Sequence, residues 1–327
     1  MPILYCAIAV PSIGCLNFSV DSHYFIDSLG AQAYYSRIMN CLSTEKRAQV
    51  VNALVEGNSV RATCRMTGIC KDAVLKLIRD LGAACAEYHN AAVRGVRAQR
   101  VQCDEVWAFC YAKDKNVSDE KKAEGAGSIW TWTAIDADSK LILSYLCGGR
   151  DAEWACSFME DLASRVATRI QVTTDGHRAY AEAVEGAFGL DVDYAMLIKL
   201  YGAPSENPET RYSPATCIGT RTAVLAGNPD PRHISTSFVE RQNLNMRMGI
   251  RRFTRLTNAF SKKFENHCHH VAIYFAFYNF CRVHQTLRVT PAMEAGLTDH
   301  VWSLEELVNL LPGVESKKRA PYKKRAA

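Results

Sequence analysis

The order of apolar and polar positions divides the chain into a helical beginning and a strand-rich remainder. Between residues 45 and 81, apolar side chains recur at helical spacing in three segments, with breaks at Gly57-Asn58 and Thr67-Gly68. Gly68 suits a tight turn because glycine accepts backbone angles that are closed to other residues. The segments 45–56, 59–66 and 71–81 therefore predict three short helices with helix-turn-helix spacing.

A polar connector from 83 to 99, which we also expect to be helical, separates these helices from a region with strand character. Two helical segments, a loop-rich insertion with five prolines over 201–234 and a long helix from about Thr236 interrupt or follow the strands. The predicted strands are 100–111, 129–136, 141–147, 170–174 and 192–200, and the interspersed helices are 151–166 and 179–188. This order predicts a mixed-sheet α/β layer architecture.

With 327 residues and 48% hydrophobic content, the chain is long enough for one large core and a smaller helical unit. We expect two folded domains with flanking segments. The predicted divisions are an N-terminal extension of unknown role over 1–38, a helix-turn-helix domain over 39–82, the connector 83–99, an α/β domain over 100–311 and a basic disordered tail over 312–327.

Charge and cysteine content narrow the possible environments. The formal net charge is +5, and the basic residues of the 312–327 tail account for it, so the folded body is close to neutral. The 13 cysteines have no paired spacing, which favours reduced thiols in a cytosolic protein. The apolar opening run lacks a positive leading segment and is interrupted by Pro11 and Gly14. We expect no targeting or membrane segment, and a cytoplasmic location.

Two groups of basic residues are candidates for contact with nucleic acid. On the third predicted helix, Lys71, Lys76 and Arg79 fall on the face away from the core, where a major-groove reader needs polar side chains. A plain three-helix bundle is the alternative. A second strip, rich in arginine and free of acidic residues, predicts phosphate contacts, with a solvated helix face as the alternative. Its arginines are Arg241, Arg247, Arg251, Arg252 and Arg255.

Three acidic residues stand where a metal site would need them. Asp104 lies in an apolar strand, where an acid is costly to bury unless it binds a cation, and Asp175 ends another strand. Glu240 lies on the helix that begins near Thr236, two turns before Arg247. Such hard oxygen ligands suit two divalent ions that activate water and stabilise a phosphodiester transition state. Taken singly, each acid has a structural alternative: an edge-strand charge at Asp104 or its neighbour Glu105, a helix cap at Asp175 and an ion pair at Glu240.

Two histidine-containing segments suggest further chemistry. The run from His267 to His270 resembles a zinc set, but adjacent helical residues point in different directions, so a packed helix is the better interpretation. His177 follows Asp175 directly and is a candidate for orienting a phosphate or assisting proton transfer, with a structural hydrogen bond as the equal alternative.

Over residues 39–311 the sequence resembles the DDE transposases of the "insertion sequence one" family of bacterial mobile elements. The segments that carry the resemblance are Gln102-Cys103-Asp104-Glu105-Val106-Trp107, Trp130-Thr131-Trp132-Thr133-Ala134-Ile135-Asp136, Thr173-Thr174-Asp175-Gly176-His177, Ser237-Phe238-Val239-Glu240-Arg241-Gln242-Asn243-Leu244 and Arg251-Arg252-Phe253-Thr254-Arg255-Leu256-Thr257-Asn258. The zinc-binding cysteine cluster found in many members ahead of the helix-turn-helix is absent from this sequence.

The resemblance implies a ribonuclease H-like catalytic core preceded by the helix-turn-helix domain. It makes Asp104, Asp175 and Glu240 the ligands of two Mg²⁺ or Mn²⁺ ions, with Arg247 as the accompanying basic residue. The implied activity is binding of terminal inverted repeats, DNA cleavage and strand transfer. The implied partners are double-stranded element ends, target DNA and further copies of the chain on DNA, in the bacterial nucleoid. The alternatives are a nuclease or resolvase on the same fold and an inactive DNA-binding derivative.

The two basic groups should respond differently to substitution. Replacing Arg251 and Arg252 with Ala should weaken binding to all DNA about equally, and each lost phosphate contact should flatten the log-log salt dependence by about 0.9. Ala at Lys76 or Arg79 should chiefly narrow the difference between terminal-repeat and random DNA, because these side chains reach base edges. Binding titrations at several salt concentrations on both DNAs measure the two effects, and an exchanged pattern would contradict this division.

Overall fold

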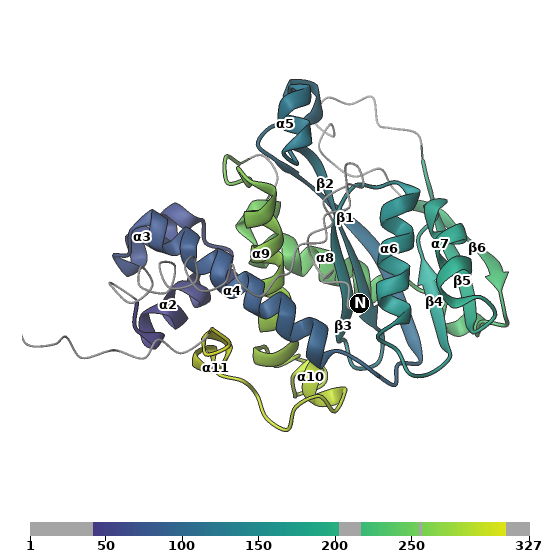
Figure 1. Cartoon of the computed structure of the whole chain (residues 1–327). Helices are drawn as coiled ribbons and strands as arrows, with labels where there is room; N and C mark the ends of the chain where they lie inside the picture. Colours follow the sequence, from purple (N-terminus) through teal and green to yellow (C-terminus); the bar gives the residue numbers. More distant parts are fainter. Residues whose placement is uncertain (1–41, 203–216, 255–256, 312–327) are drawn as a thin grey trace, which may run out of the picture.

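A six-stranded mixed sheet forms the centre of the computed structural model, which describes residues 42–202, 217–254 and 257–311 (Figure 1). The strand order is β3-β2-β1-β4-β5-β6. The strands are β1 (Arg100–Cys110), β2 (Gly127–Asp136), β3 (Ile142–Gly148), β4 (Ile170–Thr174), β5 (Val192–Tyr201) and β6 (Cys217–Ala226). Strands β1, β2 and β3 pair antiparallel, β1, β4 and β5 pair parallel, and β6 is antiparallel to β5. The predicted α/β class is confirmed, and the sheet is consistent with a ribonuclease H-like core.

Helices cover both faces of the sheet, because alternate side chains of the central strand β1 enter different cores. Val101 and Cys103 pack with residues of α6 (Ala152–Ala163) and α7 (Ala179–Phe188). Figure 1 shows these two helices on one face of the sheet. Val106, Ala108 and Cys110 pack with the second pair of helices on the other face. This second pair consists of α8 (Ser237–Gly249) and α9 (Phe264–Ala276).

The three N-terminal helices lie where the sequence predicts them, but the third is longer. They are α2 (Thr44–Val55), α3 (Val60–Thr67) and α4 (Lys71–Ala92). The side chains of Ser43 and Ser59 cap α2 and α3, Gly68 takes a φ of 70° in the turn, and Cys70 gives α4 no side-chain cap. The expected end of α4 at Leu81 is wrong, because the polar connector continues the same helix to Ala92.

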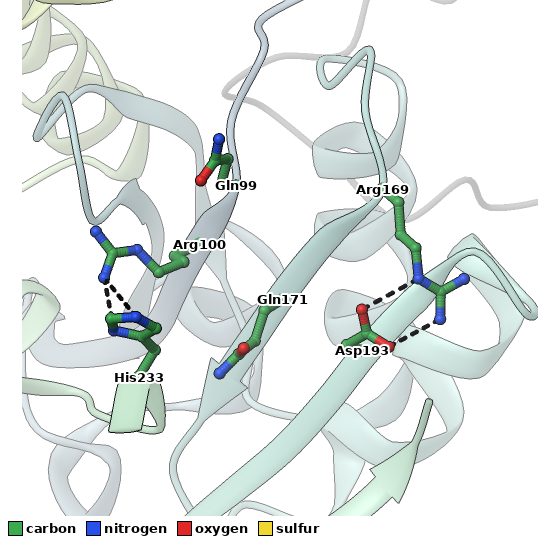
Figure 2. A pocket seen from close by; sticks show the side chains of 6 residues that line it. All are labelled: Gln99, Arg100, Arg169, Gln171, Asp193 and His233. Carbon is green, nitrogen blue, oxygen red and sulfur yellow. Dashed lines mark hydrogen bonds and ion pairs between the residues drawn. The ribbon is translucent and has the colours of Figure 1, made fainter. Parts of the chain in front are cut away.

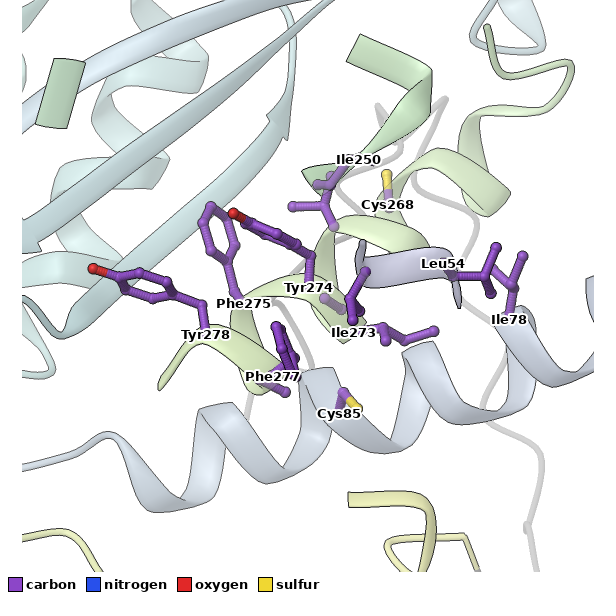
Figure 3. Close-up of a cluster of buried hydrophobic side chains, with 14 of the residues drawn as sticks. Leu54, Ile78, Cys85, Ile250, Cys268, Ile273, Tyr274, Phe275, Phe277 and Tyr278 are labelled. Atoms are coloured by element: carbon purple, nitrogen blue, oxygen red, sulfur yellow. The ribbon is translucent and has the colours of Figure 1, made fainter. Parts of the chain in front are cut away.

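The extended α4 packs lengthwise against α9, and their shared core includes residues of α2 (Figure 3). Leu54, Ile78 and Ile273 meet there as fully buried side chains. The remaining short elements are η1 (Asp114–Asn116), α5 (Asp119–Ala123), η3 (Pro231–His233), η4 (Arg251–Phe253), η5 (Phe277–Cys281), α10 (Pro291–Glu294) and α11 (Leu304–Val308). No helix within 42–202, 217–254 or 257–311 has the length and apolar character needed to cross a membrane.

The expected loop-rich insertion over 201–234 is wrong in part, since β6 occupies Cys217–Ala226. Side chains on both faces of this edge strand are exposed or half-buried. Because neither face is buried, β6 lacks the alternation of apolar and polar residues from which a strand is predicted. The rest of the insertion between 203 and 216, the extension 1–38, Arg255 and the tail 312–327 lie outside the described residues.

The contact between α4 and α9 predicts opposite effects for two glycine substitutions. A Cβ atom at Gly82 would lie 2.3 Å from the Cβ of His269 and 2.6 Å from its Cα, so Gly82→Ala must separate the helices and should destabilise the protein by roughly 1–3 kcal/mol. Gly186, exposed on α7, has open space where its Cβ would be, so Gly186→Ala should stabilise by roughly 0.5–1 kcal/mol. Urea unfolding measures the free energy of unfolding of both variants, and an equal change in the two would contradict this packing.

Candidate metal centre

Helix α8 is fixed to the sheet by a side chain of β1. The Oε1 atom of Gln102 accepts hydrogen bonds from the backbone N–H groups of Phe238, at 2.8 Å, and Val239, at 3.2 Å. These are first-turn donors that have no partner within the helix, and the residue at the cap position, Thr236, makes no side-chain cap. Gln102 therefore supplies the missing acceptor and holds the start of α8 beside the central strand.

Asp104 lies two residues further along β1 and is held on the α8 side of the sheet. Its Oδ2 accepts a hydrogen bond from Asn243 Nδ2 of α8 at 2.8 Å, and its Oδ1 accepts one from the Glu105 backbone N–H at 2.9 Å. Asn243 is buried, and its Oδ1 has no hydrogen-bond partner. One face of α8 thus orients the Asp104 carboxylate.

Asp175 meets Asp104 where the parallel pairing of β1 and β4 ends. The last registered pair is Cys103 with Thr174, so the two aspartates follow it side by side. The Oδ1 atom of Asp175 accepts a hydrogen bond from the backbone N–H of His177 at 2.9 Å, which fixes the turn after the strand. The structure therefore places Asp104 and Asp175 next to each other, as two ligands of one metal site must be.

Glu105, which the sequence offers only as an alternative to its neighbour Asp104, is the third acid of this group. Carboxylate oxygens of Asp104, Glu105 and Asp175 lie within 4.8 Å of one another. We call these three residues the acid cluster. Over the described ranges it is the one set of three or more His, Cys, Asp or Glu side chains placed to share an ion.

Glu105 is held by groups on the other side of the sheet from α8. Its side chain is 1% exposed, and its two oxygens accept hydrogen bonds from Arg150 Nε at 2.6 Å and from the Tyr180 hydroxyl at 3.0 Å. The Arg150 guanidinium also lies over the Trp130 ring, 4.4 Å from its centroid. The acid cluster is consequently supported from both faces of the sheet.

The electrostatics of the cluster favour a bound cation. Burial raises the pKa of Asp104 to about 7, and the charges of Asp175, Glu105 and Glu240 add to the effect. Burial and the charge of Asp175 also raise the pKa of Glu105, against the opposing influence of Arg150 and Tyr180. Hard carboxylate oxygens this close together suit Mg²⁺ or Mn²⁺, and a cation would relieve their repulsion. The residues present therefore fit a divalent ion.

Glu240 lies near the acid cluster but is not part of it. It is close enough for its charge to raise the pKa of Asp104. Its Oε1 forms an ion pair with Lys199 of β5 and accepts a hydrogen bond from the Thr236 hydroxyl. Partial burial acts to lower the pKa of Lys199, but the hydrogen bond and charge of Glu240 outweigh it, so this pKa is raised. The structure thus brings two of the three predicted ligands together and places the third beside a lysine.

The predicted DNA-contacting residues differ in exposure. Lys71, Lys76, Arg79 and Arg241 are exposed, whereas Arg247, Arg251 and Arg252 are half-buried. Arg252 turns inward: it donates a hydrogen bond from Nη1 to Ser261 Oγ at 2.8 Å, and burial lowers its pKa to about 10. Arg252 stays a predicted phosphate contact, but its Nη1 is already engaged by Ser261, so the salt-slope prediction is cleanest for Arg251. Ala at Arg252 should also disturb the packing.

The histidines do not extend the site. His267 and His270 are buried in α9, in agreement with a packed helix rather than a zinc set. His177 is half-buried, with its ring against Trp132 and Tyr180, and its Nε2 has no hydrogen-bond partner.

A separate polar pocket of about 450 Å³ lies where β1, β4 and β5 begin (Figure 2), whereas Asp175 of the acid cluster follows the end of β4. Its charged groups are already paired. Arg169 Nη2 lies 2.8 Å from Asp193 Oδ1, and Arg100 Nη1 lies 2.6 Å from His233 Nδ1. Because these pairs satisfy one another, the acid cluster is the stronger candidate for chemistry.

The raised pKa of Asp104 predicts how stability without metal depends on pH. The folded state keeps a proton between about pH 4 and pH 7 that the unfolded state has lost, so stability should fall by roughly 2–4 kcal/mol as pH rises through this window. Asp104→Asn should remove most of that fall, while Glu185→Gln on the exposed face of α7 should leave it unchanged. Urea unfolding in chelator at pH 5 and pH 8 measures it, and an unaltered pH dependence in Asp104→Asn would contradict the assignment.

No protein-family model and no curated protein matches this chain. Among solved structures, the chain is similar to a piggyBac transposase in a synaptic complex with hairpin DNA, with a TM-score of 0.33 and 11% sequence identity. The similarity covers 86% of this chain and 74% of the other. At this distance the likeness identifies neither a family nor an activity.

Proposed function

We propose that this chain is a DDE-type DNA transposase that binds the terminal inverted repeats of an insertion sequence, cleaves DNA there and joins the freed end to target DNA. The observation that carries the proposal is the acid cluster, in which one buried and two half-buried carboxylates that repel one another converge on one place. Strand transfer and end recognition rest on the resemblance of the motif segments to the "insertion sequence one" family.

Asp104 and Asp175 are the central metal ligands in this proposal, and Glu105 and Glu240 complete the set for two Mg²⁺ or Mn²⁺ ions. When bound, such ions activate the attacking oxygen and neutralise charge that develops on the phosphate. The chain itself orients the ligands: Asn243 holds Asp104, and the Arg150 and Tyr180 donors hold Glu105.

DNA is the proposed partner of the exposed basic residues. Helices α3 and α4 with the Gly68 turn are the proposed helix-turn-helix, and Lys71, Lys76 and Arg79 would face the major groove. Arg241, Arg247 and Arg251 lie on α8 or just after it and are the proposed phosphate contacts beside the acids. Like the family that it resembles, the chain would act as a homo-oligomer on DNA.

The test uses labelled duplexes that carry the DNA flanking the gene on each side, together with a plasmid target and Mg²⁺ or Mn²⁺. We expect cleavage near imperfect inverted repeats and joining of the labelled 3′ end to the plasmid. Asp104→Asn should reduce cleavage at least about 100-fold, because a ligand charge is lost, while DNA affinity stays within about twofold, because no phosphate contact is removed.

Glu185→Gln, which removes an exposed carboxylate on α7, is the matched control and should retain full activity. Cleavage without joining would replace the transposase by a nuclease or resolvase. Full cleavage by Asp104→Asn would exclude the acid cluster as the catalytic centre, and DNA binding without cleavage by the unaltered chain would point to an inactive derivative.

A further inference from the structure

The ion pair between Lys199 and Glu240 occupies the edge of the proposed metal centre. Lys199 lies near the end of β5, the strand next to β4, and its ammonium contacts Glu240 Oε1 across to α8. The two side chains are 31% and 39% exposed, so solvent screens the pair only in part. The Thr236 hydroxyl donates to the same oxygen. One oxygen of Glu240 is thus fully engaged by the protein's own donors.

We propose that Lys199 is a positioning residue that holds Glu240 outside the acid cluster until a divalent ion displaces the Lys199 ammonium from Glu240. This inference rests on the proposed function. Without an ion, Glu240 would be a fourth carboxylate beside Asp104, and like charges at such a site repel one another strongly. The ammonium removes that repulsion by pairing with Glu240, and Arg150 does the same for Glu105 on the opposite face.

The proposal makes the two ion sites unequal. The first ion is bound by the acid cluster. Within the described residues, Lys199 makes no hydrogen bond or ion pair with these three acids, and the charge of Asp104 acts on Lys199 less than that of Glu240, so Lys199 affects the first ion only weakly. The second ion needs Glu240 and must compete with the ammonium for it. A purely structural role, in which the pair only fastens β5 to α8, would instead change the stability of the fold and leave metal affinity unaltered.

The experiment counts Mn²⁺ ions bound to the full-length protein without DNA, using the electron paramagnetic resonance signal of free Mn²⁺. The unaltered chain should bind one ion more tightly than the second. Lys199→Met should raise the affinity for the second ion roughly threefold to tenfold and leave the first within about twofold. Lys199→Arg, which keeps the charge, should stay close to the unaltered chain. Lys199→Gln replaces Lys199→Met if the latter fails to unfold cooperatively in urea.

Two controls separate a specific effect from a general change in charge. Arg221→Gln removes an exposed positive charge from the adjacent strand β6 and should change neither affinity. In the double variant Lys199→Met/Glu240→Gln, the gain at the second site should disappear. The role of Lys199 would be overturned if Lys199→Met left the affinity for the second Mn²⁺ ion unchanged or lower. It would also be overturned if the raised affinity persisted in the double variant with Glu240→Gln. If the unaltered chain bound no Mn²⁺ at the first site, the proposed function itself would be overturned.

Discussion

The convergence of three carboxylates where β4 ends is the constraint on which the rest of the site depends. Beyond Cys103, β1 has no parallel partner, because β4 stops at Thr174 and the chain turns at Asp175. Consecutive residues of β1 normally point to opposite faces of a sheet. At the end of β4, however, carboxylate oxygens of both Asp104 and Glu105 lie within 4.8 Å of Asp175. The carboxylates repel one another, and this repulsion contributes, after burial, to the raised pKa of Asp104.

Each face of the sheet supplies donors that make this concentration of charge tolerable. On the α8 face, Gln102 fixes the helix start, and the helix then directs Asn243 at Asp104. On the α7 face, Tyr180 and Arg150 bind Glu105. A site assembled from both layers cannot shift on one face alone, so the donors preorganise the carboxylates before any cation arrives.

The sequence predicted those parts of the structure whose residues meet a strong local requirement. The buried strands β1, β2 and β4 carry apolar or β-branched runs, and α7 shows helical spacing, so their bounds were found within two residues. The pairing of Asp104 with Asp175 followed from their places within one predicted strand and at the end of another. In contrast, β6 is exposed on both faces and gives no periodic signal.

The side chains that the sequence analysis missed are those whose orientation depends on distant contacts. Lys199 lies 41 positions before Glu240 in the sequence, and only the docking of α8 beside β5 brings the two side chains together. Arg252 belongs to a basic run, yet one 3-10 turn after α8 directs it toward Ser261. Glu105 was considered only as an alternative to its neighbour Asp104, because its position in the strand gives no sign that its carboxylate also lies beside Asp175. Local rules assign a residue to an element more reliably than they assign its side chain to a site.

Under the proposed function, the packing of α4 on α9 would couple DNA recognition to DNA cleavage. Helix α4 has 22 residues, about 33 Å of continuous helix, with Lys71, Lys76 and Arg79 in its first three turns and its later turns packed beside the sheet. Gly82 lets the α9 backbone approach so closely that neither helix can slide without a clash. The same buried cluster continues from α4 through α9 to β1. Under the proposed function, the bases read by α4 and the phosphate at the acid cluster would therefore be held at a fixed spacing along the DNA.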